Sequence, residues 1–174
     1  MAIMPIIWAP DPRLKTVSER VETVDDAVLK LMDDMLETMY DEPGIGLSAI
    51  QVGIPKRIVV VDVAREGEEP RPIRLVNPVI TAESDDIAVF DEGCLSLPEF
   101  FAEIERPAEI EVAYTDETGK DRTLKADDML ARCLQHEIDH LDGILFVDHL
   151  SAVRRGMILR KLAKIKKSKL RESA

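Results

Sequence analysis

Two histidines and a glutamate at helical spacing are the residues best suited to chemistry in this sequence. Residues 136–140 read H-E-I-D-H, so His136 and His140 lie four positions apart and Glu137 lies between them. If this segment is helical, both imidazoles project from one face and can bind one small cation. Glu137 is then placed to act as a general base toward a water molecule at the metal. The pattern predicts a metal site with hydrolytic chemistry rather than two unrelated histidines.

A catalytic metal site needs a third protein ligand, and the positions close to this segment do not supply one. In one large protease group a third histidine follows six residues later, but Phe146 occupies that position here. His149 lies outside that spacing and is interpreted as a surface or helix-start residue. Cys133 would be separated from His140 by a helical rise of about 10.5 Å, too far to share one ion comfortably. We therefore interpret Cys133 as a buried residue near the substrate pocket.

Cys94 is the better candidate, because it lies in a segment that can approach the helix from outside. Residues 92–98 read E-G-C-L-S-L-P and are interpreted as a loop after a strand. A thiolate and two imidazoles leave a fourth position open for water, which is the arrangement of a catalytic site. We expect Cys94, His136 and His140 to hold one divalent metal ion per chain.

The elements that must position these residues are helices towards both ends and short strands between them. Residues 23–40 carry apolar side chains at helical spacing, with Thr23 or Asp25 as the cap, and the methionines among them are interpreted as core. Residues 118–120 indicate a hairpin turn. Strands are expected at residues 57–63, 73–80, 87–90, 108–114 and 122–125.

The helix that carries the histidines is expected at residues 129–141, with Asp127 or Asp128 as its cap and Gly143 closing it. A third helix is expected at about residues 151–170. Helices at the ends without β-α-β alternation predict an α+β fold. We expect mostly antiparallel sheets packed around a central H-E-x-x-H helix, with a basic C-terminal helix.

The charge of the chain is distributed unevenly. The net charge is −11, but residues 154–174 carry nine Lys and Arg and one acidic residue, a balance of +8, so the remaining residues carry −19. The basic tail favours a polyanionic partner such as RNA or the ribosome surface, although an amphipathic helix that merely covers the body fits equally well.

Length and composition favour one globular catalytic domain over residues 1–174, because 45% of the residues are hydrophobic and no repeat or linker interrupts them. No secretory signal and no run long enough to span a membrane is evident, which predicts a cytoplasmic protein without a membrane partner. In that setting two cysteines favour thiol or metal chemistry over a disulfide. The modest size and acidic body lead us to expect a monomer.

Three segments together resemble the motifs of the peptide deformylase family. They are residues 44–53 (GIGLSAIQVG), 92–96 (EGCLS) and 135–143 (QHEIDHLDG), and their order and separation match across essentially the whole chain. Ser48 departs from the Ala usual in the family, and Phe101 stands where some members carry Arg near the pocket rim. The resemblance implies removal of the formyl group from N-formylmethionyl nascent peptides. It also implies Fe(II) as the natural metal, with Zn, Ni or Co able to occupy the same ligands.

The resemblance also implies roles for individual residues. Glu137 acts as general base and then as general acid, and the oxyanion is stabilised by the Gln51 amide and the Leu95 backbone N–H. Gly46 and Gly93 are expected where the substrate backbone comes close, and Ile45 is expected to offer it backbone hydrogen bonds. The methionine slot, with core packing as the alternative, is expected to be lined by Ile45, Phe90, Met129 and Cys133.

Two other functions are compatible with the same residues. A zinc endopeptidase that uses the H-E-x-x-H helix would cut internal amide bonds, and a structural metal-binding or ribosome-associated protein would have no activity. Glu92 is expected to pair with Arg106 behind the metal loop, or to form an ordinary surface pair with it. Release of formate from formyl-methionyl peptides would distinguish a deformylase from the zinc endopeptidase and from the protein without activity.

Overall fold

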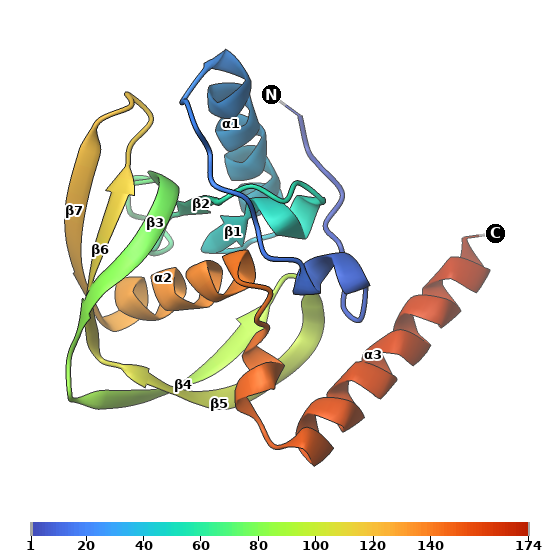
Figure 1. The fold of residues 1–174 in the computed structure, drawn as a ribbon. Coiled ribbons are helices and arrows are strands. Elements are labelled where there is room, and N and C mark those ends of the chain that lie inside the picture. The colour runs from blue at the N-terminus through green and yellow to red at the C-terminus, as the bar shows by residue number, and fades with distance from the viewer. Residues whose placement is uncertain (1, 174) are drawn as a thin grey trace.

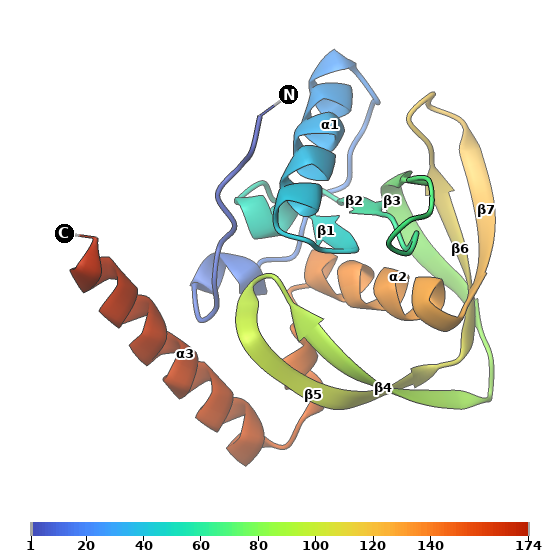
Figure 2. The same cartoon turned by 180° about the vertical axis from the view of Figure 1, so that it is seen from behind.

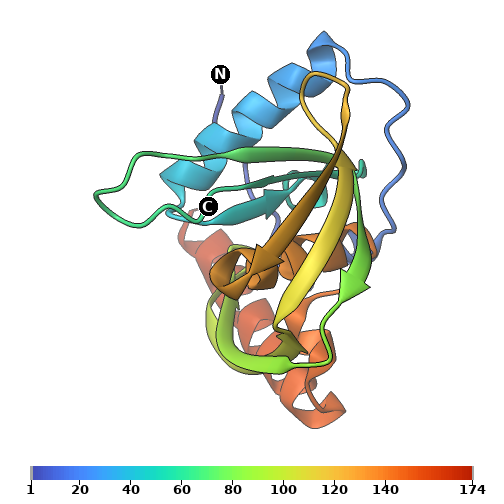
Figure 3. The same ribbon diagram turned by 90° about the vertical axis from the view of Figure 1, so that its left-hand side faces the viewer.

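A helix in the middle of the molecule organises the computed structural model, which describes residues 2–173. Helix α2 (Asp128–Leu141) lies between a five-stranded and a two-stranded antiparallel sheet, and a further helix, α1 (Asp26–Asp41), covers the outer side of the larger sheet (Figures 1 and 3). The larger sheet has the order β1 (Gly46–Ser48), β2 (Ile58–Val61), β3 (Ile73–Glu83), β6 (Glu109–Thr115) and β7 (Asp121–Asp127). The smaller sheet pairs β4 (Ile87–Cys94) with β5 (Leu97–Pro107). This confirms the predicted α+β class with antiparallel sheets around the H-E-x-x-H helix.

Strand β2 shows why the layers stack in this order. Its four residues are all buried, because alternate side chains point to opposite faces of the sheet. Ile58 and Val60 pack in the cluster under α1, whereas Val59 and Val61 pack in the cluster over α2. Full burial of each such side chain contributes about 1.5–3 kcal/mol, so a strand that is apolar on both faces stabilises the sheet between two helices.

Helix α1 begins where the sequence predicts a cap. The Asp25 carboxylate accepts a hydrogen bond from the Val28 backbone N–H at 2.9 Å, which satisfies one of the free donors of the first turn. Met32, Met35 and Met39 are fully buried in the cluster between α1 and the sheet, which confirms that they belong to the core.

Helix α2 is also bounded as predicted, with Asp127 at its N-cap position and Gly143 two residues after its last turn. Gly143 has a φ of +74°, and a Cβ at this position would lie 2.5 Å from the Lys15 carbonyl oxygen. Both the left-handed conformation and the close backbone require glycine here.

All five expected strands are present, several of them longer than predicted, and the turn near Gly119 is formed with a φ of +82°. Strands β1 and β5 were not predicted. Strand β1 has only three residues, too few for a clear pattern. The buried face of β5 consists of Ala102, Ile104 and Arg106, so a small and a charged residue occupy positions where large apolar residues are expected. Cys94, expected in a loop, is the last residue of β4.

Helix α3 (Ala152–Glu172) lies at the periphery, outside the two sheets and α2 (Figure 2), and its C-terminal half contacts the N-terminal segment, where Lys166 Nζ donates to the Trp8 carbonyl at 3.3 Å. Ser151 caps it by accepting from the Arg154 N–H at 3.3 Å. Leu162 is the one residue of this helix that is classed as buried. Within residues 2–173, no helix combines the length and the apolar character needed to cross a membrane.

Candidate metal centre

One sulfur and two imidazole nitrogens converge beside α2. Cys94 Sγ lies 3.3 Å from His140 Nε2, which in turn lies 3.2 Å from His136 Nε2. All three ligand atoms lie within 4.8 Å of one another, and the structure forms no other cluster of this kind among residues 2–173. The three side chains predicted to bind a metal are therefore brought together.

The local structure explains this convergence. His136 and His140 are one turn apart on a helix that is held between the two sheets, so their rings reach the same point. Cys94 precedes the tight turn of the β4–β5 hairpin, where the pairing register shifts between Gly93 and Cys94. An irregularity of this type redirects a side chain, and here it places the sulfur against the helix.

The electrostatics of the three side chains suit a cation. Burial opposes charge on His136, but the adjacent Cys94 and Glu92 outweigh this and raise the pKa of His136 well above its ordinary value. Burial, together with the charge of His136, lowers the pKa of His140 well below its ordinary value. Two nitrogens that face each other at 3.2 Å cannot both carry a proton, so the site is rich in electron pairs. A thiolate and two imidazoles are suitable ligands for Fe(II), Zn, Ni or Co, and the donor set therefore fits one divalent ion.

Glu137 lies beside this centre, on the next position of the same helix. Its side chain is buried, and burial is the main reason that its pKa is raised to about 7. Its Oε2 atom has no hydrogen-bond partner among the described residues. A buried carboxylate with a free oxygen that lines the cavity can exchange a proton with a bound reactant.

Gln51 is oriented by its neighbours. Its Oε1 accepts from the Ser48 backbone N–H at 2.9 Å and from the Ser48 hydroxyl at 3.0 Å. Because a backbone N–H can only donate, the amide NH₂ group must face the other way. There it lies 3.1 Å from Ser96 Oγ and 3.6 Å from Cys94 Sγ. Gln51 therefore presents donors to the metal centre, and Ser48 serves to hold its amide oxygen.

A buried ion pair supports the ligands from behind. Arg106 donates from Nε and Nη2 to the two carboxylate oxygens of Glu92, at 2.9 and 3.0 Å, and from Nη1 to Asp139 at 3.0 Å. Glu92 in turn lies 3.7 Å from His136 Nδ1. The pairing expected behind the metal loop is therefore buried, rather than an ordinary surface pair. His149 contacts Asp139 at 2.8 Å and is not part of the metal cluster.

A cavity of about 310 Å³ opens in front of the centre. Its lining includes Leu95 and four residues expected to contact substrate, namely Ile45, Gly46, Gly93 and Cys133. The two glycines are also required by the protein itself. A Cβ on Gly46 would lie 2.7 Å from Glu137 Oε1, and one on Gly93 would lie 2.4 Å from the Phe101 ring.

Phe90 and Met129, also expected to line the slot, are not among the lining residues. Both contact Arg132, which is a lining residue and which sequence reasoning missed. Its position on the helix, four residues before His136, is the signal that could have identified it.

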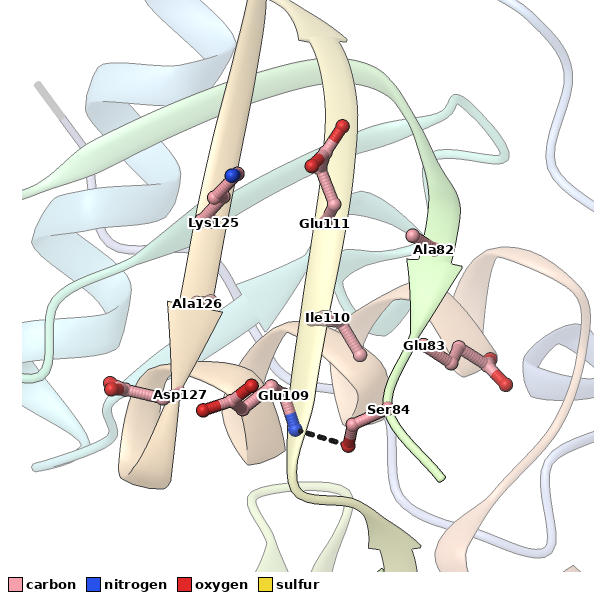
Figure 4. Close-up of a pocket in the computed structure, with 9 residues that line it drawn as sticks. All are labelled: Ala82, Glu83, Ser84, Glu109, Ile110, Glu111, Lys125, Ala126 and Asp127. Carbon is pink, nitrogen blue, oxygen red and sulfur yellow. Dashed lines mark hydrogen bonds between the residues drawn. The ribbon is translucent and has the colours of Figure 1, made fainter. Parts of the chain in front are cut away.

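A larger hollow of about 470 Å³ lies away from the centre, on β3, β6 and β7. Its charged lining consists of Lys125 and four acidic residues. In Figure 4 the Glu83 carboxylate points away from those of Glu109 and Asp127, and the one hydrogen bond drawn joins Glu109 N–H to Ser84 Oγ. Because its acidic groups do not converge, we assign the chemistry to the smaller cavity.

Comparisons with known proteins cover almost the full chain. A family model described as polypeptide deformylase matches residues 3–156. The peptide deformylase of Agrobacterium fabrum is 55% identical over 170 residues, which are 98% of this chain and 100% of that protein. A crystal structure of peptide deformylase from Ehrlichia chaffeensis has a TM-score of 0.92 and 42% identity, and covers 97% of this chain and 99% of that chain. A second one from that organism, in complex with actinonin, has a TM-score of 0.90, 45% identity and coverages of 94% and 98%.

Proposed function

The chain belongs to the polypeptide deformylase family, and we propose that it removes the N-formyl group of newly made polypeptides at the centre of Cys94, His136 and His140. The reaction is hydrolysis of an amide bond. Water adds to the formyl carbon, and the products are formate and a peptide with a free amino terminus. The observation that carries this proposal is the convergence of one sulfur and two imidazole nitrogens within 4.8 Å, beside a cavity that His136 and Glu137 line.

A divalent ion bound by these three side chains would supply Lewis-acid chemistry, lowering the pKa of a water molecule and polarising the formyl carbonyl. We propose Fe(II) as the resident ion on the basis of the family resemblance, with Zn, Ni or Co able to bind the same ligands. A thiolate beside ferrous iron is sensitive to oxygen. Metal analysis of protein purified without oxygen therefore identifies the ion.

Glu137 moves the proton in this scheme. It accepts a proton from the attacking water and delivers it to the amide nitrogen as the carbon–nitrogen bond breaks. Its burial, its free oxygen and its position on the cavity wall support this role. A Cβ on Gly46 would lie 2.7 Å from Glu137 Oε1, so the glycine leaves the space that the carboxylate occupies.

Gln51 and Leu95 are proposed to stabilise the negative charge that develops on the formyl oxygen. The Gln51 amide already directs its NH₂ group towards the Cys94 sulfur, so no reorientation is needed during the reaction. Leu95 lies in the turn directly after Cys94 and lines the cavity, and its backbone N–H is the second donor.

The substrate backbone is proposed to bind as an added strand. Strand β1 is an edge of its sheet, and the cavity lies between Gly46 on this strand and Gly93 on β4. The Ile45 carbonyl already accepts from the Asp62 N–H at 2.8 Å, within the sheet. By the alternation of an antiparallel strand, the backbone groups of Gly46 face the unpaired edge. Cys133 and Ile45 then remain as apolar walls for the methionine side chain.

Hydrolysis of formyl-Met-Ala-Ser tests the proposed function. Glu137→Gln should lower kcat by a factor on the order of 10²–10⁴ while metal content is retained, because the carboxylate acts only as a proton carrier. Glu103→Gln, the same change at an exposed position, serves as the matched control. Cuts within unformylated peptides would support the zinc endopeptidase instead, and metal binding without any hydrolysis would support a structural role.

We also propose that residues 1–174 act as one monomeric catalytic domain in the cytoplasm and that α3 binds the ribosome surface. The +8 charge of residues 154–174 and the shallow packing of this helix support contact with phosphates. Charge removal on exposed lysines of the helix should weaken ribosome co-sedimentation at low salt and make the remaining binding less dependent on salt, without changing hydrolysis of a short peptide. The test variant carries Lys→Gln at Lys161, Lys164 and Lys167, and the matched control carries the same change at Lys56, Lys120 and Lys125. Equal co-sedimentation of these two triple variants at low salt would refute this role.

A further inference from the structure

The cavity in front of the metal centre contains an arginine that has no acidic partner within residues 2–173. Arg132 lies on α2, and its guanidinium carbon is 4.6 Å from the centre of the Phe90 ring. Its Nη2 atom lies 2.6 Å from Met129 Sδ. Among residues 2–173, this is the one side-chain hydrogen bond that Arg132 makes. No carboxylate oxygen there lies within 4.0 Å of it, although residues 1–153 carry a charge of −19. The arrangement leaves a cation available to a ligand.

The cation–π contact of Arg132 with Phe90 holds the guanidinium in place and so bears on which ligand it can bind. A guanidinium stacked on an aromatic ring keeps its plane fixed and presents its N–H donors at the edge. A thioether sulfur is a weak acceptor, so the Met129 contact leaves most of the five donors unused. The fork of donors matches a carboxylate, which can accept two parallel hydrogen bonds. Arg132 is therefore preorganised for a carboxylate at the cavity rim.

The position of Arg132 indicates which substrate residue would supply that carboxylate. Arg132 precedes His136 by four helical residues, a rise of about 6 Å along α2. In an extended substrate the side chains of the first and third residues point to the same face and are about 6.6 Å apart. With the formyl group at the metal centre and the methionine side chain against Cys133, the third side chain lies on the same face, about 6.6 Å farther from the centre. Arg132 adjoins Cys133 on the side of α2 away from His136. The second side chain points to the opposite face.

We propose that Arg132 selects formyl-methionyl chains that carry Asp or Glu as their third residue. This inference rests on the proposed function of the metal centre. It adds that the centre discriminates among nascent chains by a charge two residues beyond the methionine. Because Arg132 lies at the rim and remains half-exposed, the preference should diminish as salt screens the pair.

A matched series of peptides tests the proposal. For the unmodified protein, kcat/KM for formyl-Met-Ala-Glu-Ser should exceed that for formyl-Met-Ala-Gln-Ser about tenfold at low salt, equivalent to about 1.4 kcal/mol. The corresponding pair with the charge moved to the second residue, formyl-Met-Glu-Ala-Ser and formyl-Met-Gln-Ala-Ser, should differ by less than about twofold. Equal rates for the first pair, or a larger effect in the second pair, would overturn the assignment.

Variants of Arg132 test the residue itself through the same ratio, so that general damage to the pocket cancels. Arg132→Gln should reduce the ratio to near one, and Arg132→Glu should invert the order, so that a third-residue Lys becomes preferred to Glu. Arg20→Gln, which removes one exposed positive charge elsewhere, should leave the tenfold ratio unchanged. Retention of the ratio in Arg132→Gln would overturn the proposal. If no peptide yields formate, both the proposed function and this inference are wrong. If formate is released but the Glu and Gln peptides have equal kcat/KM, only this inference is wrong.

Discussion

Replacing Arg106 by Met removes the cation of the buried ion pair behind the proposed metal ligands and retains most of the volume of the side chain. The side chains of Arg106 and Glu92 are 5% and 3% exposed, and two hydrogen bonds of 2.9 and 3.0 Å join them. Glu92 holds a charge there although burial opposes it, because the adjacent His136 and Arg106 side chains lower its pKa to about 2. Without the guanidinium, the Glu92 carboxylate would remain buried with its main partner absent.

The expected cost of Arg106→Met is about 3–5 kcal/mol in the free energy of unfolding, the range found when one partner of a buried pair is removed. For a domain of this size each kcal/mol lowers the melting temperature by about 2–4 °C, so the midpoint should fall by about 6–20 °C. The added change Glu92→Gln removes the unpaired charge. The double variant should therefore be more stable than Arg106→Met alone.

Urea denaturation of the three proteins, with metal content held equal, measures this coupling. Arg71→Met is the matched control, because it breaks an ion pair whose arginine is 73% exposed, and it should have a much smaller effect. A cost below about 1 kcal/mol for Arg106→Met, or strictly additive costs in the double variant, would refute the reasoning.

Three further substitutions have expected outcomes. Gly46→Ala should lower kcat/KM about a hundredfold with metal content intact, because the new methyl group displaces the Glu137 carboxylate; activity within twofold of the parent would contradict this. Cys94→Ser should reduce bound metal in elemental analysis, and full occupancy would exclude its sulfur as a ligand. Asp116→Asn should lower the urea midpoint at pH 7, because hydrogen bonds hold the pKa of Asp116 well below its ordinary 3.8; this contribution exists above pH 3.8 and is lost as pH falls towards the depressed value. The difference from the Glu117→Gln control should therefore shrink in acid, and a constant difference would refute the assignment.

The sequence predicts the helices well, because each has a local explanation. The Asp25 cap, the spacing of apolar residues over α1 and the stop at Gly143 all act over a few residues. Strand β5 lacks such a local explanation. Arg106 occupies one of its inward positions, and its burial makes sense only once Glu92 on the neighbouring strand is seen to neutralise it.

The three residues proposed to bind the metal could be named from residue chemistry, but their convergence could not be derived. Cys94 and His140 are separated by 46 positions, and only the packing of the hairpin against α2 brings their atoms to 3.3 Å. Gln51 could be suggested from the family motif, whereas the direction of its amide depends on Ser48. Arg132 escaped notice because a charged residue on a helix is usually interpreted as solvated, and its contact with Phe90 requires the fold.

The ligands of the centre come from both sides of the molecule, the sulfur from the smaller sheet and the imidazoles from the helix that lies on the larger one. A bound cation would therefore connect the two layers, and removing it with a chelator should loosen that connection. The free energy of unfolding should then depend on metal occupancy, and every tenfold rise in free metal above its dissociation constant should add about 1.4 kcal/mol to it.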